Sequence, residues 1–461
     1  MSFHRLQLLL LALFLTSCTL RPPYEAPKVA PATLHESDAA FFAAKPYDAK
    51  WWRQFDDPTL ESLENAALLS NHDVRIAVAR VQQARAAYNE TSLDRFPKIT
   101  ATASLDRRES AIPGFVDEPL ARSTYTAGFD AFWELDLFGR VRAQVRGANA
   151  AAQSVEASLD DVLVSVSAEV ARNYFELRGL QQQLAVAERS LANQRETLRL
   201  TQLRRDAGVG EEQDVASAAA RVAGTEASLS PLRASIAGRR YRIAVLAGVR
   251  PGELSIDLSP KPYATIAKEL PLGDPSQLLR RRADIRAAER RLAAADATVD
   301  LATADLWPRI SISGFLGLLA GRGNLFGTSD SRAWAVTPAI SWSAFDLGSA
   351  RARLRGAKAG ESEALAAYEQ TVLGALEETE DALVAYREQQ QRLVKLNDQA
   401  RESARAASIA RARYREGVAD FLTLLDAERT QLQAEDAVAQ GESGVFTSVV
   451  AVYKALGGIS E

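Results

Sequence analysis

The residues that could do chemistry in this 461-residue chain are few. It has one cysteine, Cys18, and three histidines, His4, His35 and His72. A single cysteine forms no disulfide within one chain, and these residues are too few for a Cys/His zinc site. The acids fall mostly on solvated helix faces, so no pair stands out as a general acid and base. No Gly-rich phosphate loop opens a helix, and no Ser/His/Asp set is credible. We therefore expect no enzyme, no metal and no bound nucleotide.

The cysteine itself has a defined chemistry. Cys18 follows the apolar run LQLLLLALFL and ends the tetrapeptide LTSC, which looks like a bacterial lipobox. The run is too short to span a bilayer as a permanent helix. We interpret residues 1–17 as a signal peptide and Cys18 as the lipid-bearing N-terminus of the mature chain, with no other cofactor. A buried cysteine near an ordinary cleavage site is the alternative. Thr19 follows instead of aspartate, which favours the outer membrane.

Charge and hydropathy limit the possible partners. The chain has 55 basic and 59 acidic residues, which gives no nucleic-acid footprint. After Cys18 there is no run of about 18 apolar residues, so we expect no transmembrane helix in the mature chain. If the chain crosses a membrane, it must do so as strands closed into a barrel.

Two very long helices are predicted where proline is missing. Apolar residues recur there at spacings of three and four, over roughly 140–206 and 348–415. Each helix would be about 100 Å long, which favours packing side by side as coiled coils or a helical barrel. Each stops at a glycine, Gly208 or Gly417, and helical periodicity then resumes. The pattern predicts two helical hairpins with glycine-terminated turns.

The two hairpins belong to a tandem duplication. Matching glycines stand 209 residues apart, in the pairs Gly139 and Gly348, Gly208 and Gly417, and Gly248 and Gly457. The segments RFPKITATAS and LWPRISISGF also match, with Pro97 and Pro308 standing 211 residues apart. A shared offset over most of each half indicates one duplicated unit rather than a short-period solenoid.

Two alternating segments in each half predict four strands. They are apolar on one face and small or polar on the other, as in membrane-barrel strands, although a soluble half-buried sheet is the alternative. The polar faces carry Asp106, Asp130 and Glu134, which we expect to face a barrel lumen. The links RESAIPGFVDEPLAR and AGRGNLFGTSDSR suit exposed loops. Four strands do not close a barrel, so oligomerisation is required, and a dimer or a trimer would both close.

The assembled motifs resemble the TolC-like outer-membrane factors, closest to the lipoprotein branch of OprM and NodT-type efflux proteins. The matching residues include the lipobox, WWRQFDDPTL from Trp51, WELDLFGRVR from Trp133 and YREGVADFLTLLDAER from Tyr414. The resemblance covers essentially the whole mature chain. It implies an α+β membrane protein: a trimeric 12-stranded transmembrane β-barrel, four strands per chain, continuous with a 12-helix periplasmic α-barrel. It also implies a homotrimer that meets a periplasmic adaptor, an inner-membrane RND-type pump and outer-membrane lipid, with no nucleic acid.

The same resemblance implies two sets of site residues. Leu422 and Asp426 would form rings that constrict the periplasmic end of the tunnel. The adaptor would dock at the hairpin tips, on Arg204, Gly208, Val209, Arg413, Gly417 and Val418. The alternatives are that Leu422 packs inside the coiled coil while Asp426 pairs with an arginine such as Arg429, and that the glycines are plain helix caps.

We divide the chain on this basis into nine segments. They are a signal peptide (1–17), a lipid-anchored tether (18–50), periplasmic helices with an equatorial segment (51–96), membrane strands (97–136), a helical hairpin (137–248), an equatorial linker (249–272), a periplasmic helix (273–307), membrane strands (308–346) and a second hairpin (347–461). A kink is expected at Pro231, in the first hairpin only.

The expected function is a passive exit duct for small toxic compounds. A channel of a type I protein secretion system has the same fold and is the nearest alternative. A structural periplasmic coiled-coil lipoprotein is a second, but it would not need amphipathic strands with acidic inner faces.

Overall fold

The computed structural model describes residues 22–27, 34–37, 40–43, 45, 50–112, 116–263, 269–273 and 278–457. The expected signal peptide and Cys18 lie outside the described residues. The chain forms two compact units, each assembled from three segments. Unit 1 comprises Met1–Lys28, Arg80–Glu156 and Ala287–Gln370, and unit 2 comprises Val29–Ala79, Ala157–Arg286 and Thr371–Glu461.

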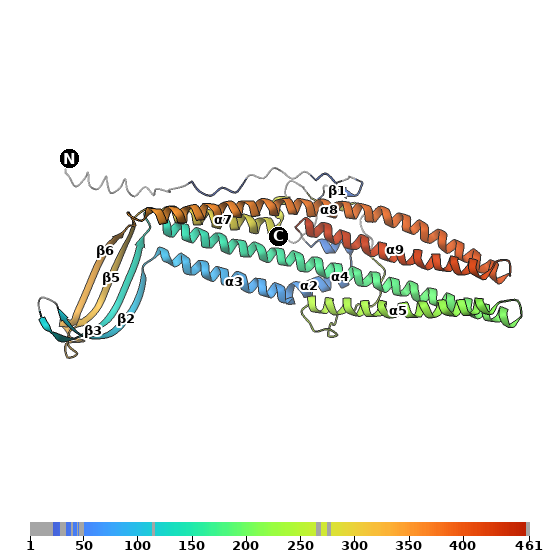
Figure 1. The fold of residues 1–461 in the computed structure, drawn as a ribbon, viewed down its shortest axis with the longest axis horizontal. Coiled ribbons are helices and arrows are strands. Elements are labelled where there is room, and N and C mark those ends of the chain that lie inside the picture. Colours follow the sequence, from blue (N-terminus) through green and yellow to red (C-terminus); the bar gives the residue numbers. More distant parts are fainter. Residues whose placement is uncertain are drawn as a thin grey trace. The chain divides into compact units, whose positions relative to one another are not determined.

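Unit 1 contains one antiparallel sheet of four strands in the order β2-β3-β5-β6 (Figure 1). The strands are β2 (Lys98–Ile112), β3 (Val116–Leu135), β5 (Arg309–Ala320) and β6 (Arg332–Ser341). β2 and β6 are the two edges, and each leaves one row of backbone groups unpaired within the sheet. Pro338 lies on edge strand β6, where its missing N–H is tolerated.

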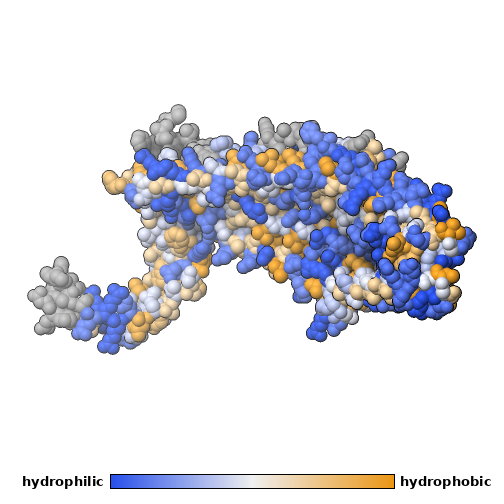
Figure 2. Space-filling model, turned by 45° about the vertical axis from the view of Figure 1, so that its right-hand side comes forward, coloured by the Kyte–Doolittle hydropathy of each residue, from blue (hydrophilic) through white to orange (hydrophobic). Residues whose placement is uncertain are grey.

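The register places the expected apolar residues on one face of this sheet. Phe129 stands opposite Leu316, and Leu316 stands opposite Trp334. Their side chains are exposed in the described chain, up to 77% for Trp334. Figure 2 shows this as an apolar band along the sheet, with hydrophilic residues beyond it towards the strand turn. Unit 1 therefore has a large exposed apolar face, and exposing such a face to water is unfavourable.

One glycine pair shapes the opposite face. Gly128 and Gly317 stand directly opposite each other. A Cβ on Gly317 would lie 2.3 Å from the carbonyl oxygen of Ala127 and 3.0 Å from the ring of Phe315. The strands therefore approach closely under an aromatic ring, and neither position accepts a side chain without movement.

One expectation about this sheet was wrong. The link from Arg108 to Arg122 was expected to be an exposed loop, but most of it is strand. Arg108 pairs with Arg122 and Ser110 with Leu120. The Ser, Gly, Pro and charged residues of this link are typical of turns. The hydrogen bonds of an antiparallel pair join backbone groups, however, so they form whatever most of these side chains are. The second link does follow expectation, because β5 ends at Ala320 and β6 begins at Arg332.

The helices follow the proline and glycine pattern closely. The two long helices are α4 (Arg140–Asp206) and α8 (Leu347–Arg415), and each returns after a turn as α5 (Glu212–Leu246) or α9 (Phe421–Ala455). The shorter helices are α2 (Pro58–Ser70), α3 (His72–Ser92), α6 (Leu278–Arg281) and α7 (Ala283–Ala304), with 3-10 turns at Trp51–Phe55, Leu93–Arg95 and Ser329–Ser331. Pro231 lies inside α5, and the expected kink stays a prediction. Within the described part of the chain, none of these helices combines the length and apolarity needed to cross a membrane.

The duplication repeats a contact where helix meets strand. The indole Nε1 of Trp133 donates to the carbonyl of Arg95 at 3.1 Å. In the other half, Trp342 donates to the carbonyl of Leu306 at the same distance. Each acceptor stands two residues before a proline that ends the helix, so its last carbonyls lack helical donors.

Unit 2 has an aromatic core built on the segment that precedes α2. Trp51 stacks on Tyr453 with centroids 5.5 Å apart, and Phe55 packs on Phe175 at 4.8 Å. Asp57 caps α2, and its side chain accepts from the backbone N–H groups of Thr59 and Leu60. Two short strands, β1 (Phe42–Ala43) and β4 (Leu270–Pro271), pair in parallel beside this core.

An unusual acid lies in the same unit. Glu64 on α2 is fully buried, and neither carboxyl oxygen accepts a hydrogen bond among the described residues. Burial raises the pKa of Glu64 well above its usual range, and the neighbouring Ser167 hydroxyl offsets only part of this rise. In the folded chain the Glu64 carboxyl thus keeps a proton that it releases at about pH 4.3 in the unfolded chain.

Glu64→Gln should stabilise unit 2 at neutral and alkaline pH. The contribution of Glu64 to stability is greatest below the pKa of the unfolded chain, and it falls as pH rises towards the raised folded pKa. Glutamine removes this dependence, so the free energy of unfolding should rise by about 1–3 kcal/mol at pH 8 and little at pH 4. Thermal unfolding at both pH values checks it, with Glu61→Gln as control, because Glu61 lies on the same helix but is partly exposed and pairs with Arg53. A variant no more stable than wild type at pH 8 would contradict it.

Candidate functional site

The two hairpin turns have the same backbone geometry. Gly208 and Gly417 both have φ of 77°. In the first turn the Val209 N–H donates to the carbonyl of Arg204, and in the second the Val418 N–H donates to that of Arg413, at 3.0 and 2.9 Å. This pattern is a Schellman helix end, which needs a left-handed residue and so favours glycine.

The six expected docking residues lie at these turns but are not equivalent. Val209 and Val418 are exposed to 66% and 63%, and Arg413 is also exposed. Arg204 instead turns inward, where its Nη1 donates to the carbonyl of Tyr414 at 3.1 Å and its guanidinium stacks over the Tyr414 ring. Arg204 therefore ties the two turns together, while Val209, Val418 and Arg413 are free to meet a partner.

The expected gate residues lie on one exposed face of α9. Leu422 is 66% exposed, so it does not pack against the other helices of its own chain. Asp426 does pair with Arg429, at 2.5 Å, and both side chains are more than half exposed. Leu422 and Asp426 also line an open groove of about 720 Å³ between α8 and α9, together with Ile409 and Arg413. The two residues thus share one accessible surface, as a constriction would need.

A buried ion pair fastens the hairpins just behind this surface. The Glu428 carboxylate on α9 is 5% exposed. Its Oε1 accepts from Arg411 Nε and Nη2 on α8, at 3.1 and 2.9 Å, and from Thr197 Oγ1 on α4, at 3.0 Å. Sequence reasoning missed this group, because no local spacing brings residues of three helices together.

The three expected lumen acids share the polar face of the sheet. Asp130 accepts from the Thr102 hydroxyl at 2.6 Å, and Asp106 pairs with Arg108 at 2.6 Å. Glu134 forms a two-pronged ion pair with Arg140, at 2.6 and 2.7 Å, where the strand leads into α4. Each acid is thus satisfied locally. Among the described residues, no three or more His, Cys, Asp or Glu side chains are grouped to hold a metal ion.

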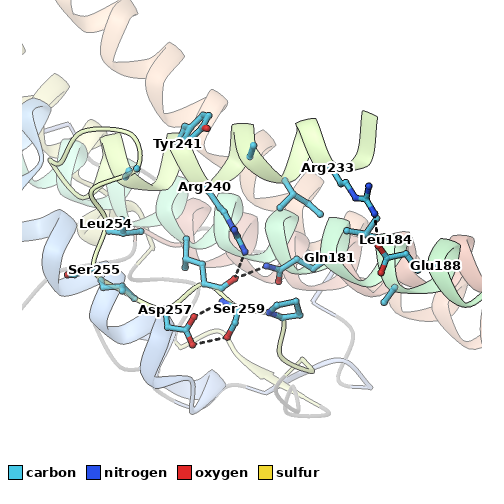
Figure 3. A pocket seen from close by; sticks show the side chains of 18 residues that line it. Gln181, Leu184, Glu188, Arg233, Arg240, Tyr241, Leu254, Ser255, Asp257 and Ser259 are labelled. Carbon is cyan, nitrogen blue, oxygen red and sulfur yellow. Dashed lines mark hydrogen bonds and ion pairs between the residues drawn. The ribbon is translucent and has the colours of Figure 1, made fainter. Parts of the chain in front are cut away.

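A pocket of about 940 Å³ lies between α4, α5 and the loop 252–260 (Figure 3). The Leu258 carbonyl accepts from Gln181 at 2.7 Å and from Arg240 at 3.4 Å. The Ser259 hydroxyl and backbone N–H both donate to Asp257 and hold the pKa of that carboxyl below its usual value. The remaining wall is largely apolar. No sequence pattern predicted this pocket, and its groups form no acid–base couple.

The family follows from the comparison of this chain with known proteins. The model of the outer membrane efflux protein family matches residues 63–249 and 275–458, one stretch in each half. The chain belongs to this family. It is 32% identical over 463 residues to the antibiotic efflux pump outer membrane protein ArpC of Pseudomonas putida, covering 98% of this chain and 95% of that protein. It is 30% identical over 469 residues to the pyoverdine export outer membrane protein OpmQ of the same species, covering 99% and 97%.

Solved structures agree with this assignment. The outer-membrane channel OprN superposes with a TM-score of 0.93 at 50% identity, covering 96% of this chain and 99% of that one. The resemblance, the fold class and the outer-membrane location expected from the sequence are thereby confirmed. The names of these relatives describe pump components and channels, not enzymes.

Proposed function

We propose that this protein is the exit duct of a tripartite efflux system, carrying small toxic compounds passively from an inner-membrane pump to the cell exterior. The observation that carries the proposal is the four-stranded sheet, apolar and exposed on one face and polar on the other, joined to two long helical hairpins. Family membership supports the same conclusion.

Closure of the sheet favours a homotrimer. Edge strands β2 and β6 leave backbone N–H and C=O groups unpaired. Each unpaired group in lipid costs about several kcal/mol. Three copies would join edge to edge into twelve strands and enclose a lumen. Two copies would give eight strands, and a barrel of about that size has an interior filled by side chains. Asp106, Asp130 and Glu134 would then face the lumen, and α4, α5, α8 and α9 of the three chains would form the tunnel wall.

The partners are an adaptor and a pump that supplies the energy. The sequence has no nucleotide-binding motif, so transport must be driven from elsewhere. We infer that a periplasmic adaptor docks at the two hairpin turns and links the duct to an RND-type pump. The relatives named for antibiotic and pyoverdine export favour small molecules over the alternative, a type I protein secretion channel.

A strain test addresses this function. The adaptor and pump of the same cell, placed in a strain without its own efflux channels, should confer resistance to a substrate such as ethidium only when this chain is present. We expect a rise of severalfold in the inhibitory concentration and a matching fall in dye accumulation. Equal resistance with and without the chain would contradict the proposal.

We also propose that Cys18 carries the lipid anchor. The LTSC box behind an apolar run supports it. Cys18→Ser should leave the precursor uncleaved at this site and unlabelled by radioactive palmitate, since serine has no thiol to acylate. The wild-type chain is the positive control. Labelling of the serine variant would place the lipid elsewhere.

A further inference from the structure

One arginine near the hairpin turns has no partner. Arg221 on α5 has a buried Nε that meets no acceptor, and it makes no hydrogen bond or ion pair within the described part of the chain. The side chain as a whole is only half-buried, so part of its guanidinium is open to solvent. Buried polar groups are nearly always hydrogen-bonded, and a charged one is costly to leave unpaired. The Nε–H group of Arg221 thus lacks a hydrogen-bond acceptor.

The packing of α5 shows what surrounds this side chain. Ala218, three residues before Arg221, lies in a buried cluster with Tyr414, Phe421 and Leu424 of the α8–α9 hairpin. Residues three apart share one face of a helix, so Arg221 lies along the face that meets α9. The next charged residues on α9 after Leu424 are Asp426, Glu428 and Arg429.

The positive and negative side chains around Arg221 do not balance. Glu428 is engaged by Arg411 and Thr197, and Asp426 is engaged by Arg429. Three arginines therefore share two carboxylates, and Arg221 is the one left over. Burial and the charge of Arg429 lower the pKa of Arg221, while Glu428 acts in the opposite direction. One further negative group would neutralise the cluster.

We propose that Arg221, together with Arg429, binds a small oxyanion such as phosphate. A guanidinium presents N–H donors in a planar fork that matches two oxygens of a phosphate or carboxylate. Glu428 does not fill the role, since three hydrogen bonds hold its Oε1 towards α8 and α4. The open part of the Arg221 side chain gives a dissolved anion access. The ligand class is thus a small oxyanion from solution.

The site would bear on the gate, and this step rests on the proposed function. An anion between Arg221 and Arg429 competes with Asp426 for the same guanidinium. Asp426 would then regain its full charge at the mouth of the tunnel. Phosphate should therefore increase the cation preference of the channel when ionic strength is held constant.

Thermal unfolding of the purified full chain tests the site. Sodium phosphate replaces sodium chloride at constant ionic strength, for wild type, Arg221→Gln, Arg221→Lys and the control Arg233→Gln. Arg233 is the matched control because it also lies on α5 but already pairs with Glu188 at 3.0 Å. Phosphate at about ten times its Kd should raise the midpoint of wild type and Arg233→Gln by about 1–3 °C more than that of Arg221→Gln. The lysine variant keeps the charge without the fork and should show a smaller rise.

Three results would each overturn one part of the proposal. An equal rise in all four proteins would mean an adventitious ion only, acting through general salt effects, and would overturn the site. Channel recordings separate this failure from that of the proposed function. A cation preference that phosphate leaves unchanged in a conducting wild type refutes the link to the gate. Absence of any conductance refutes the duct, whatever the thermal data show.

Discussion

Leu422→Ala and Asp426→Ala channels should conduct several times more current than the wild type, and the aspartate variant should also prefer cations less. Three-fold symmetry would turn the exposed Leu422 into an apolar collar and Asp426 into a ring of three carboxylates. Truncating such a collar would widen the passage. Removing such a ring would remove the charge that attracts cations and repels anions.

The ion pair with Arg429 sharpens this prediction. The Arg429 guanidinium offsets much of the negative charge of Asp426 in each chain. Arg429→Gln should therefore strengthen the cation preference of the channel. Asp398 is a suitable control, because it forms an exposed pair with Arg401 at the same spacing, far from the turn. Asp398→Ala should leave conductance and selectivity unchanged. Wild-type conductance in both Leu422→Ala and Asp426→Ala would refute the gate.

Gly417→Trp should abolish drug resistance while the amount of folded trimer stays close to that of wild type. A Cβ at Gly417 would meet only Arg204 Nη1, at 3.6 Å, so the space for a side chain is present. The left-handed φ of 77° costs a non-glycine residue about 1–2 kcal/mol, too little to unfold so large a chain. The indole would instead occupy the surface beside Val418, where we expect the adaptor to approach.

Two variants separate docking from backbone strain. Gly417→Asn tolerates the left-handed conformation with a small side chain and should keep most of the resistance. Gly252 has a φ of 91° with open space around it but lies in the loop after α5. Gly252→Trp should therefore behave as wild type. Full resistance in Gly417→Trp would show that the turn is only a helix cap.

The sequence was most informative where a single local rule decides the structure. The expected ends of the long helices lie within one residue of those of α4 and α8, because glycine ends them and proline is missing between. The two faces of the sheet followed from alternation alone. The strand ends did not, since turn-like residues from Arg108 to Arg122 are held by backbone pairing.

The candidate site was predictable only in part. Gly208, Gly417, Leu422 and Asp426 lie in contiguous motifs and could be named from the sequence. The buried Glu428 pair, the inward turn of Arg204 and the unpaired Arg221 could not, because each depends on which helices pack together and at what height. Such contacts between distant elements have no local pattern.

The central claim is that this chain assembles into a conducting duct. Purified full-length protein, reconstituted at low density in a planar lipid bilayer, tests it most directly. The account predicts stable single-channel steps of uniform size, obtained from the trimer and altered by Leu422→Ala. A correctly folded trimer that inserts in the bilayer yet carries no current, in wild type and in Leu422→Ala alike, would contradict it.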